Sequence, residues 1–248
     1  MTRHHHPTPA RREDPATYPR RRLVVAGGLG AIPLLAWTRA ANTTRASKAA
    51  VPIRPIIATA VGYLAGTIPS ADIATRLARN DTTDLRAAGS GNPGALNTAT
   101  ILGPRWGLAV LASDMAKGAA AGSLGRVIAG PTGAYAAATA SIAGHIVPVW
   151  TRGRGGKGVA TSAGACLAVF PAYFPIDAAV AAAAAVTHRN AERTIWISSS
   201  AWIAAALLWW RCRLPNAWGP PPTAGLPLFA LSGAAVILAK FRSARRTA

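Results

Sequence analysis

From residue 51 onward, long apolar stretches alternate with short basic loops along the chain. The apolar stretches lack the polar stripe at helical spacing that a soluble amphipathic helix carries, and the run 178–186 contains only alanine and valine. A soluble alanine-rich bundle is the alternative, but it would need such stripes. We therefore expect an all-α, polytopic membrane helix bundle. Its predicted spans are about seven in number: 55–77, 106–127, 131–149, 159–174, 175–187, 195–210 and 226–239.

Details of the spans support a membrane location. Several are rich in alanine and glycine, which let helices approach closely in lipid. Tryptophans stand near the predicted span ends, where indoles prefer the membrane interface; they are Trp106, Trp150, Trp209 and Trp210. Pro171 and Pro175 bracket a break, so the fourth and fifth spans are also interpreted as one hairpin, the fifth being short, tilted or re-entrant.

The first 50 residues differ in composition from the rest. They are rich in proline, arginine and threonine, and we interpret residues 1–50 as a basic, disordered extension to a membrane domain at 51–248. The apolar run 23–37 is short for a span. We favour an extra span or a non-essential extension over a cleaved signal peptide. His4, His5 and His6 are interpreted as part of a solvated tail.

The charge is lopsided, with 27 Lys and Arg against 8 Asp and Glu, for a net charge of +19. Such a balance suits nucleic acid or an anionic membrane surface, and a hydrophobic chain with its charges in short segments favours the membrane. The segments 78–105, 150–158, 188–194 and 240–248 hold twelve Lys and Arg, whereas the opposite loops hold three, Arg126, Arg211 and Arg213. The positive-inside rule therefore predicts that the twelve-charge side, with the C-terminus, is cytoplasmic. We expect no nucleic-acid partner.

Two cysteines, Cys166 and Cys212, are too few for a disulfide framework or a cysteine-based zinc site. Neither a metal nor a cofactor is expected.

Candidate chemistry gathers first in a glycine-rich loop at 84–97, which contains the sequence GSGNPGALN. Glycines permit positive φ and let backbone N–H groups converge on an anion. An ordinary turn-rich loop is the alternative. Its candidate anion-binding residues are Arg86, Gly89, Ser90, Gly91, Asn92, Gly94 and Asn97.

A second loop reads GRGGKGVAT, from Gly153 to Thr161, and joins two predicted spans. Glycines and cations interleave just before a helix whose first N–H groups would face the same anion. A basic loop of the positive-inside kind explains the charges but not the glycines that flank Lys157. The loop is not a Walker A motif, because Gly158 stands where a Ser or Thr would hold magnesium. We select Gly155, Gly156, Lys157, Gly158 and Thr161 as candidate site residues.

Three ionisable residues lie inside predicted spans. Asp114 and Lys117 are three residues apart on one helix face, and His145 precedes Trp150 by five residues. Intramembrane charges are costly and usually functional. Purely structural pairing of Asp114 with Lys117, and a packing role for His145, are the alternatives to phosphate binding and catalysis.

The motifs GSGNPGALN, SDMAKG, GHIVPVW and GRGGKGVAT, in this order and spacing, resemble the acyl-phosphate glycerol-3-phosphate acyltransferase family of bacteria, the PlsY family. The resemblance runs from about Gly62 to Gly164. It implies a seven-span membrane enzyme that moves an acyl chain from acyl phosphate to the 1-position of glycerol 3-phosphate. The product is lysophosphatidic acid, and neither acyl-CoA nor acyl carrier protein is used. It implies catalytic roles for Ser90, Asn92, Lys157 and His145, the last a positional one, and phosphate contacts for the other candidate residues, including Arg86 and Lys117.

Three positions depart from the family pattern. Thr100 stands where the first motif has arginine, and Phe241 and Ala244 stand where a histidine and an asparagine close the last span. The sequence His188-Arg189-Asn190 looks similar to that closing motif but falls two spans early. These departures favour, as a rival, a non-catalytic relative that binds phosphorylated lipid precursors. A small-solute transporter is a second rival, although no inverted repeat is visible.

Overall fold

The computed structural model describes residues 52–78 and 83–246, and within these residues the chain forms helices and no strand. The expected extension 1–50, with its apolar run 23–37, lies outside the described residues. The helices are α1 (Ile53–Gly66), α2 (Ser70–Leu77), α3 (Ala95–Leu102), α4 (Pro104–Ile146), the 3₁₀ turn η1 (Val149–Thr151), α5 (Val159–Val169), α6 (Phe174–His188), α7 (Ala191–Cys212) and α8 (Gly225–Arg246).

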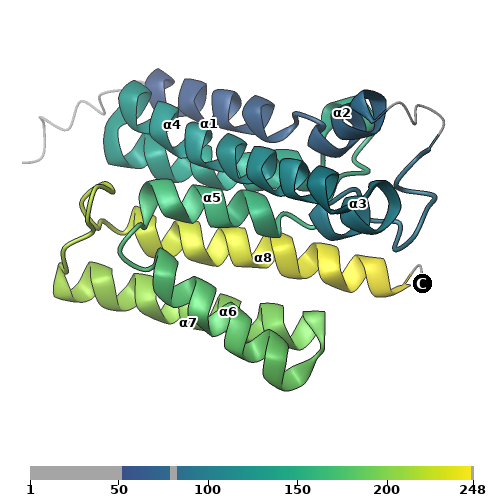
Figure 1. Cartoon of the computed structure of the whole chain (residues 1–248). Coiled ribbons are helices and arrows are strands. Elements are labelled where there is room, and N and C mark those ends of the chain that lie inside the picture. Colours follow the sequence, from purple (N-terminus) through teal and green to yellow (C-terminus); the bar gives the residue numbers. More distant parts are fainter. Residues whose placement is uncertain (1–51, 79–82, 247–248) are drawn as a thin grey trace, which may run out of the picture. The chain divides into compact units, whose positions relative to one another are not determined.

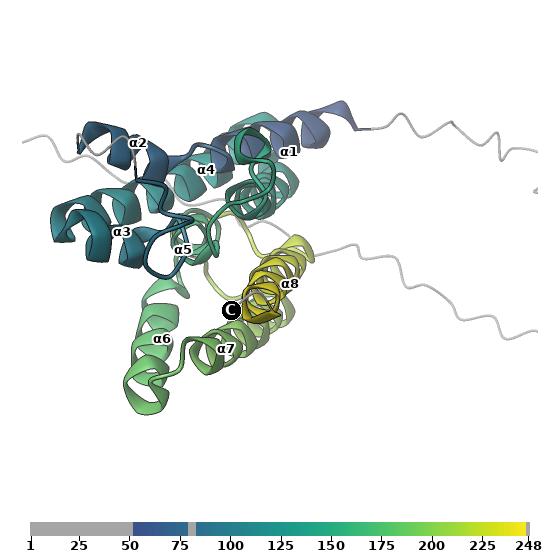
Figure 2. The same ribbon diagram turned by 90° about the vertical axis from the view of Figure 1, so that its right-hand side faces the viewer.

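In Figure 1 the long helices follow one another from top to bottom in the order α1, α4, α5 and α8, with α6 and α7 lowest. Helix α8 packs mainly against α4 and α7. Helix α4 is the centre of this arrangement, since α1, α3, α5 and α8 all pack against it. Seen after a quarter turn, α6 and α7 lie together on the side away from α1 and α2 (Figure 2).

The segment predicted as one span at 55–77 is two helices, α1 and α2, separated at Thr67–Pro69. Proline lacks an N–H and disfavours helical geometry in the residue before it, so the helix ends ahead of Pro69. The break leaves the carbonyl of Ile68 free to accept a hydrogen bond of 2.9 Å from Lys117 Nζ.

Helix α4 contains the second and third predicted spans, which meet at a reversal. Ala129 and Gly130 leave helical geometry, with φ of 60° at Gly130, and Pro131 begins the returning half. A Cβ on Gly125 would collide with the carbonyl of Gly133. The two halves therefore come into backbone contact next to the turn.

The interpretation of the fourth and fifth spans as one hairpin is wrong. Helix α5 ends at Val169, and α6 packs mainly against α7 rather than against α5. Phe170 and Tyr173 are buried in the junction, with ring centroids 5.2 Å apart, so the chain leaves α5 through the core instead of folding back on it.

Two further helical segments were not predicted. Residues 95–102, expected to be loop, form α3, and the expected tail from residue 240 continues α8 to Arg246. Lys240, Phe241 and Ala244 consequently stand on a helix surface.

The main core joins α4, α5, α7 and α8 around Phe229, whose ring meets Trp202 edge-on at 5.0 Å. Many large apolar side chains stay exposed, among them Val127 at 84% and Val186 at 77%. Two segments, Ile53–Leu77 and Gly225–Ala244, are long and apolar enough to cross a membrane by length and composition. An exposed apolar surface of this extent is what a lipid-facing protein requires.

Candidate active site

A cleft of about 980 Å³ opens at one end of the bundle. Four segments that are distant in sequence line it, and they belong to the four segments that the charge pattern assigns to one side. The lining residues are Arg86, Ser90, Gly91, Asn92, Gly155, Lys157, Arg189, Asn190, Ala191, Glu192, Lys240, Phe241, Ser243 and Ala244. Both glycine-rich loops therefore meet at one site with the α6–α7 junction and the end of α8.

The first glycine-rich loop is shaped by Asn97, which is 4% exposed. Its amide nitrogen donates to the carbonyls of Leu85 and Ala88, both at 3.0 Å, and its Oδ1 accepts the N–H of Ser90 at 2.8 Å. A Cβ on Gly89, whose φ is 59°, would collide with that Oδ1. The side-chain hydrogen bonds of Asn97 thus all stabilise the loop, and Ser90, Gly91 and Asn92 of that loop line the cleft.

The second glycine-rich loop runs into the N-terminus of α5. The N–H of Gly155 donates to the carbonyl of Ile146 at 3.2 Å. Within the described part of the chain, no acceptor takes the N–H groups of Gly156, Lys157 or Gly158. Free N–H groups at a helix N-terminus are able to bind an anion, and binding of phosphate by this loop stays a prediction.

Lys157 is held over an aromatic ring. Its Nζ lies 4.6 Å from the ring centroid of Phe241, which is 8% exposed. A cation over a ring face gains roughly 0.5–2 kcal/mol, depending on its exposure. Phe241, one of the two residues on α8 that depart from the family pattern, therefore contacts Lys157 of the second loop.

Arg86 ties the loops to α2. Its guanidinium makes a bidentate ion pair with Asp72, at 2.7 and 3.0 Å, and its Nε donates to the carbonyl of Arg154 at 2.7 Å. The hydrogen bonds to Asp72 raise the pKa of Arg86, whereas the N–H of Arg86 lowers the pKa of the Asp84 carboxyl by hydrogen bonding to it. Arg86 thus stays charged, but much of that charge is already compensated.

Asp114, Lys117 and His145, the three ionisable residues of the predicted spans, surround a second, much smaller cavity of about 20 Å³, which also touches Arg86 and Gly155. Lys117 Nζ lies 2.9 Å from Asp114 Oδ1, an ion pair without hydrogen-bond alignment, and His145 Nδ1 lies 3.6 Å from the same oxygen. A Cβ on Gly156 would collide with Nε2 of His145. The imidazole thus packs against the second loop, and the cavity has room for about one water.

The predicted site residues therefore fall into three groups. Arg86, Ser90, Gly91, Asn92, Gly155 and Lys157 line the cleft, while Lys117, His145 and Gly156 line the small cavity. The remainder line neither, namely Gly89, Gly94, Asn97, Gly158 and Thr161, of which Gly89 is exposed and Thr161 fully buried. Thr100, one of the departures, is exposed on α3 and outside the cleft.

Sequence reasoning did not select Arg189, Asn190 or Glu192, although all three line the cleft. The only signal was the likeness of His188-Arg189-Asn190 to a closing motif expected two spans later. Its significance appears once α6 and α7 bring the junction to face α8.

Comparison with known proteins matches residues 56–247 to the family model described as glycerol-3-phosphate acyltransferase. A glycerol-3-phosphate acyltransferase of Nitrobacter winogradskyi is 46% identical over 115 residues, which are 46% of this chain and 58% of that protein. One from Bradyrhizobium diazoefficiens is 36% identical over 154 residues, or 62% and 76% of the two chains. The alignments to the Nitrobacter protein and to one from Thermoanaerobacter thus span 58% of each relative's length.

The fold is similar to crystal structures of PlsY (YgiH), an integral membrane glycerol 3-phosphate acyltransferase. Its glycerol 3-phosphate form gives a TM-score of 0.61 at 27% identity, covering 76% of this chain and 88% of that one. Its lysophosphatidic acid form gives 0.62 at 25% identity with the same coverage. Together with the exposed apolar surface, this likeness makes the chain an integral membrane protein, and its described part is built of helices without strands.

Proposed function

Because this chain belongs to the glycerol-3-phosphate acyltransferase family, we propose that it transfers an acyl group from acyl phosphate to the 1-position of glycerol 3-phosphate. The proposal rests on the cleft, which both glycine-rich loops line. Among the described residues, four basic side chains and one carboxylate line it. Both substrates are phosphates, and such a lining suits two anions in one site.

We assign the acyl phosphate to the second glycine-rich loop. Lys157, which lines the cleft, would hold its phosphate with its ammonium and its free N–H, and the adjoining Gly156 and Gly158 also have free N–H groups in this loop. Ser90 and Asn92, on the facing loop, supply neutral hydrogen-bond donors. Asn97 and Arg86 act as positioning residues, the first by shaping its loop and the second by linking both loops to α2.

The chemistry needs no covalent enzyme intermediate, because acyl phosphate is already activated. The 1-hydroxyl of glycerol 3-phosphate attacks the acyl carbon, the new C–O bond forms, and the bond from that carbon to the phosphate oxygen breaks. The hydroxyl proton goes to the departing phosphate, and the products are lysophosphatidic acid and inorganic phosphate. The protein contributes mainly positioning and charge stabilisation.

We also propose that the cleft opens to the cytoplasm. The four segments that line it carry the basic excess, which the positive-inside rule assigns to that side. Glycerol 3-phosphate would then enter from the aqueous side and acyl phosphate from the adjoining leaflet.

The test is turnover by the purified full chain in lipid vesicles. It should form lysophosphatidate from acyl phosphate and glycerol 3-phosphate, and not from acyl-CoA. Phosphate release without acyl transfer, or efficient use of acyl-CoA, would contradict the proposal. Binding of glycerol 3-phosphate without turnover would favour the non-catalytic relative, for which the apolar residues Phe241 and Ala244 in the cleft are the motivation.

A further inference from the structure

The four cationic side chains of the cleft differ in whether a neighbouring group already balances their positive charge. Arg86 is held by Asp72, and Lys157 lies over the ring of Phe241. Among the described residues, Arg189 and Lys240 form no ion pair. These two cations, from the α6–α7 junction and from α8, are therefore the ones available to an incoming anion.

We propose that Arg189 is a binding residue for the phosphate of glycerol 3-phosphate, with Lys240 as its partner on α8. The inference rests on the proposed function and assigns the acceptor substrate to a separate wall of the cleft. That wall consists of the α6–α7 junction and the last turns of α8, and it meets the donor loop where Lys157 lies over the ring of Phe241.

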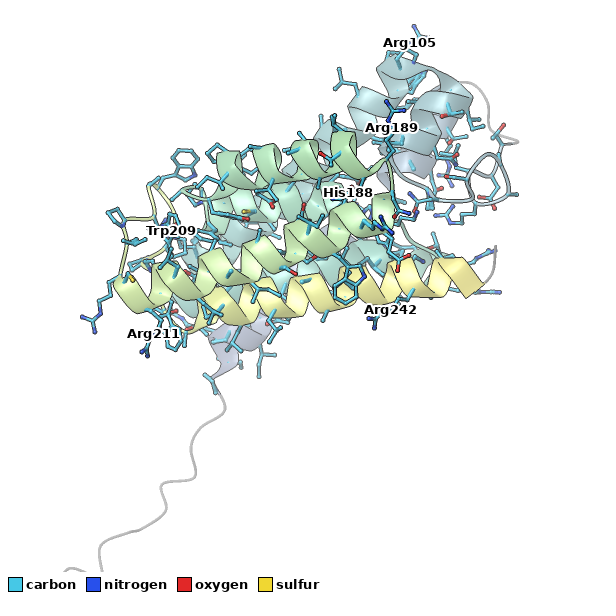
Figure 3. All side chains as sticks on the ribbon, turned by 90° about the horizontal axis from the view of Figure 1, so that it is seen from below. Arg105, His188, Arg189, Trp209, Arg211 and Arg242 are labelled. Carbon is cyan, nitrogen blue, oxygen red and sulfur yellow. The ribbon has the colours of Figure 1, made fainter. Side chains whose placement is uncertain are left out.

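The backbone fixes where Arg189 is presented. Helix α6 ends at His188, and Arg189 takes a left-handed conformation with φ of 46° while its N–H still donates to the carbonyl of Ala185 at 3.0 Å. The next residue, Asn190, caps α7 by accepting the N–H of Arg193 at 2.9 Å. Arg189 thus occupies a two-residue turn braced by a helix on each side, at the same end of the bundle as Arg242 and opposite Arg211 (Figure 3).

The character of the α8 wall explains why the junction has to contribute. Phe241 and Ala244 offer no hydrogen-bonding side chain, so on α8 the cleft has Lys240 and Ser243 as its polar groups. A dianionic phosphate is bound best by several charge-assisted hydrogen bonds, and an arginine fork can supply two of them.

Exposure indicates which of the two substrates Arg189 meets. Its side chain is exposed, as suits capture of a small dianion from water, whereas Lys157 is half-buried at the glycine-rich loop. Acyl phosphate is anchored by its chain in lipid and needs no such capture. A basic cleft also raises the local concentration of a soluble anion and speeds its association.

The experiment compares Arg189→Gln with Arg193→Gln, an exposed arginine of the same junction that does not line the cleft. Loss of a charge-assisted contact should raise the KM for glycerol 3-phosphate about 10- to 100-fold in Arg189→Gln, with kcat and the KM for acyl phosphate nearly unchanged. Arg193→Gln should behave like the unaltered protein, and Arg189→Lys should recover part of the loss. High salt should reduce the difference between Arg189→Gln and the unaltered protein.

An unchanged KM for glycerol 3-phosphate in Arg189→Gln would overturn the inference, as would a rise confined to the KM for acyl phosphate. Equilibrium dialysis with labelled glycerol 3-phosphate separates this inference from the proposed function. If the unaltered chain binds glycerol 3-phosphate without turnover, the proposed function fails while weaker binding in Arg189→Gln still supports the inference. No binding by the unaltered chain, or equal binding by both, would overturn it.

Discussion

Lys157 carries the largest expected effect of any single residue in the site. It stands just before α5, its own N–H and those of Gly156 and Gly158 have no acceptor among the described residues, and its contact with phosphate would be charge-assisted. Losing such a contact in a partly dry site costs roughly 3 kcal/mol, so Lys157→Ala should lower turnover at least about 100-fold. Steady-state kinetics in vesicles measures this, with Arg152→Ala, exposed on the same loop and outside the cleft, as the control. Near-normal turnover in Lys157→Ala would mean that the donor site is elsewhere.

Phe241 should act on the reaction through Lys157 rather than by touching substrate. Phe241→Leu keeps an apolar side chain but removes the ring face 4.6 Å from Nζ, whereas Phe241→Tyr keeps it. The loss of about 0.5–2 kcal/mol should lower kcat/KM roughly 2- to 30-fold in the leucine variant alone. Equal kinetics in the two variants would show that the ring only fills space.

Close packing of α1 on α4 should control stability. A Cβ on Gly62 would collide with the backbone of Ala137, and one on Gly66 with the backbone of Ser141. Backbone atoms cannot move aside as a flexible side chain can, so Gly62→Leu should cost about 1–3 kcal/mol or more and lower the Tm by roughly 2–12 °C. Thermal unfolding in detergent measures this, with Ala60→Leu, at an exposed position of the same helix, as the control. Equal Tm values for the two variants would contradict close packing of α1 on α4.

The elements that sequence predicted well are those set by hydrophobic length. The apolar stretches of α6, α7 and α8 were located from their composition, and Pro131 marked the reversal within α4. The prediction of an α5–α6 hairpin was wrong because a proline marks where a helix ends but does not indicate which neighbour that helix packs against. Helix α3 was missed because eight residues after a glycine- and proline-rich loop carry too weak a periodic signal.

The candidate site divides in a similar way. The glycine-rich loops were recognisable because few residue types permit their backbone, and Lys157 stood out between glycines. The role of Asn97 depends on which carbonyls its amide meets, and that of Arg189 on two helices meeting opposite α8. Such roles arise from contacts across the fold, which composition and spacing do not encode.

For the whole molecule, the arrangement predicts a sharp difference in labelling between its two ends. Single cysteines at Ser90, Arg152 and Ser243, in a chain carrying Cys212→Ser, should react with a membrane-impermeant maleimide only when the cytoplasmic face is open. The native Cys212 is exposed at the end of α7 and should react from outside. Cys166 is buried and should contribute little labelling of its own. Labelling of any one of the three engineered positions from outside intact cells would contradict their placement on one, cytoplasmic, side.

At the end of the bundle away from the cleft, the chain exposes little extended peptide between its described helices. Two residues reverse α4, and the junction after α5 is buried at Phe170 and Tyr173. The segment 213–224 is the one long connection there, with Ala217 and Trp218 exposed. A protease acting from that end would nick this segment and leave every described helix intact, so that α8 would stay with the rest by packing alone. In covalent terms the molecule is thus a body that carries both glycine-rich loops and the α6–α7 junction, and a detachable helix, α8, that brings Lys240 and Phe241 to the same cleft.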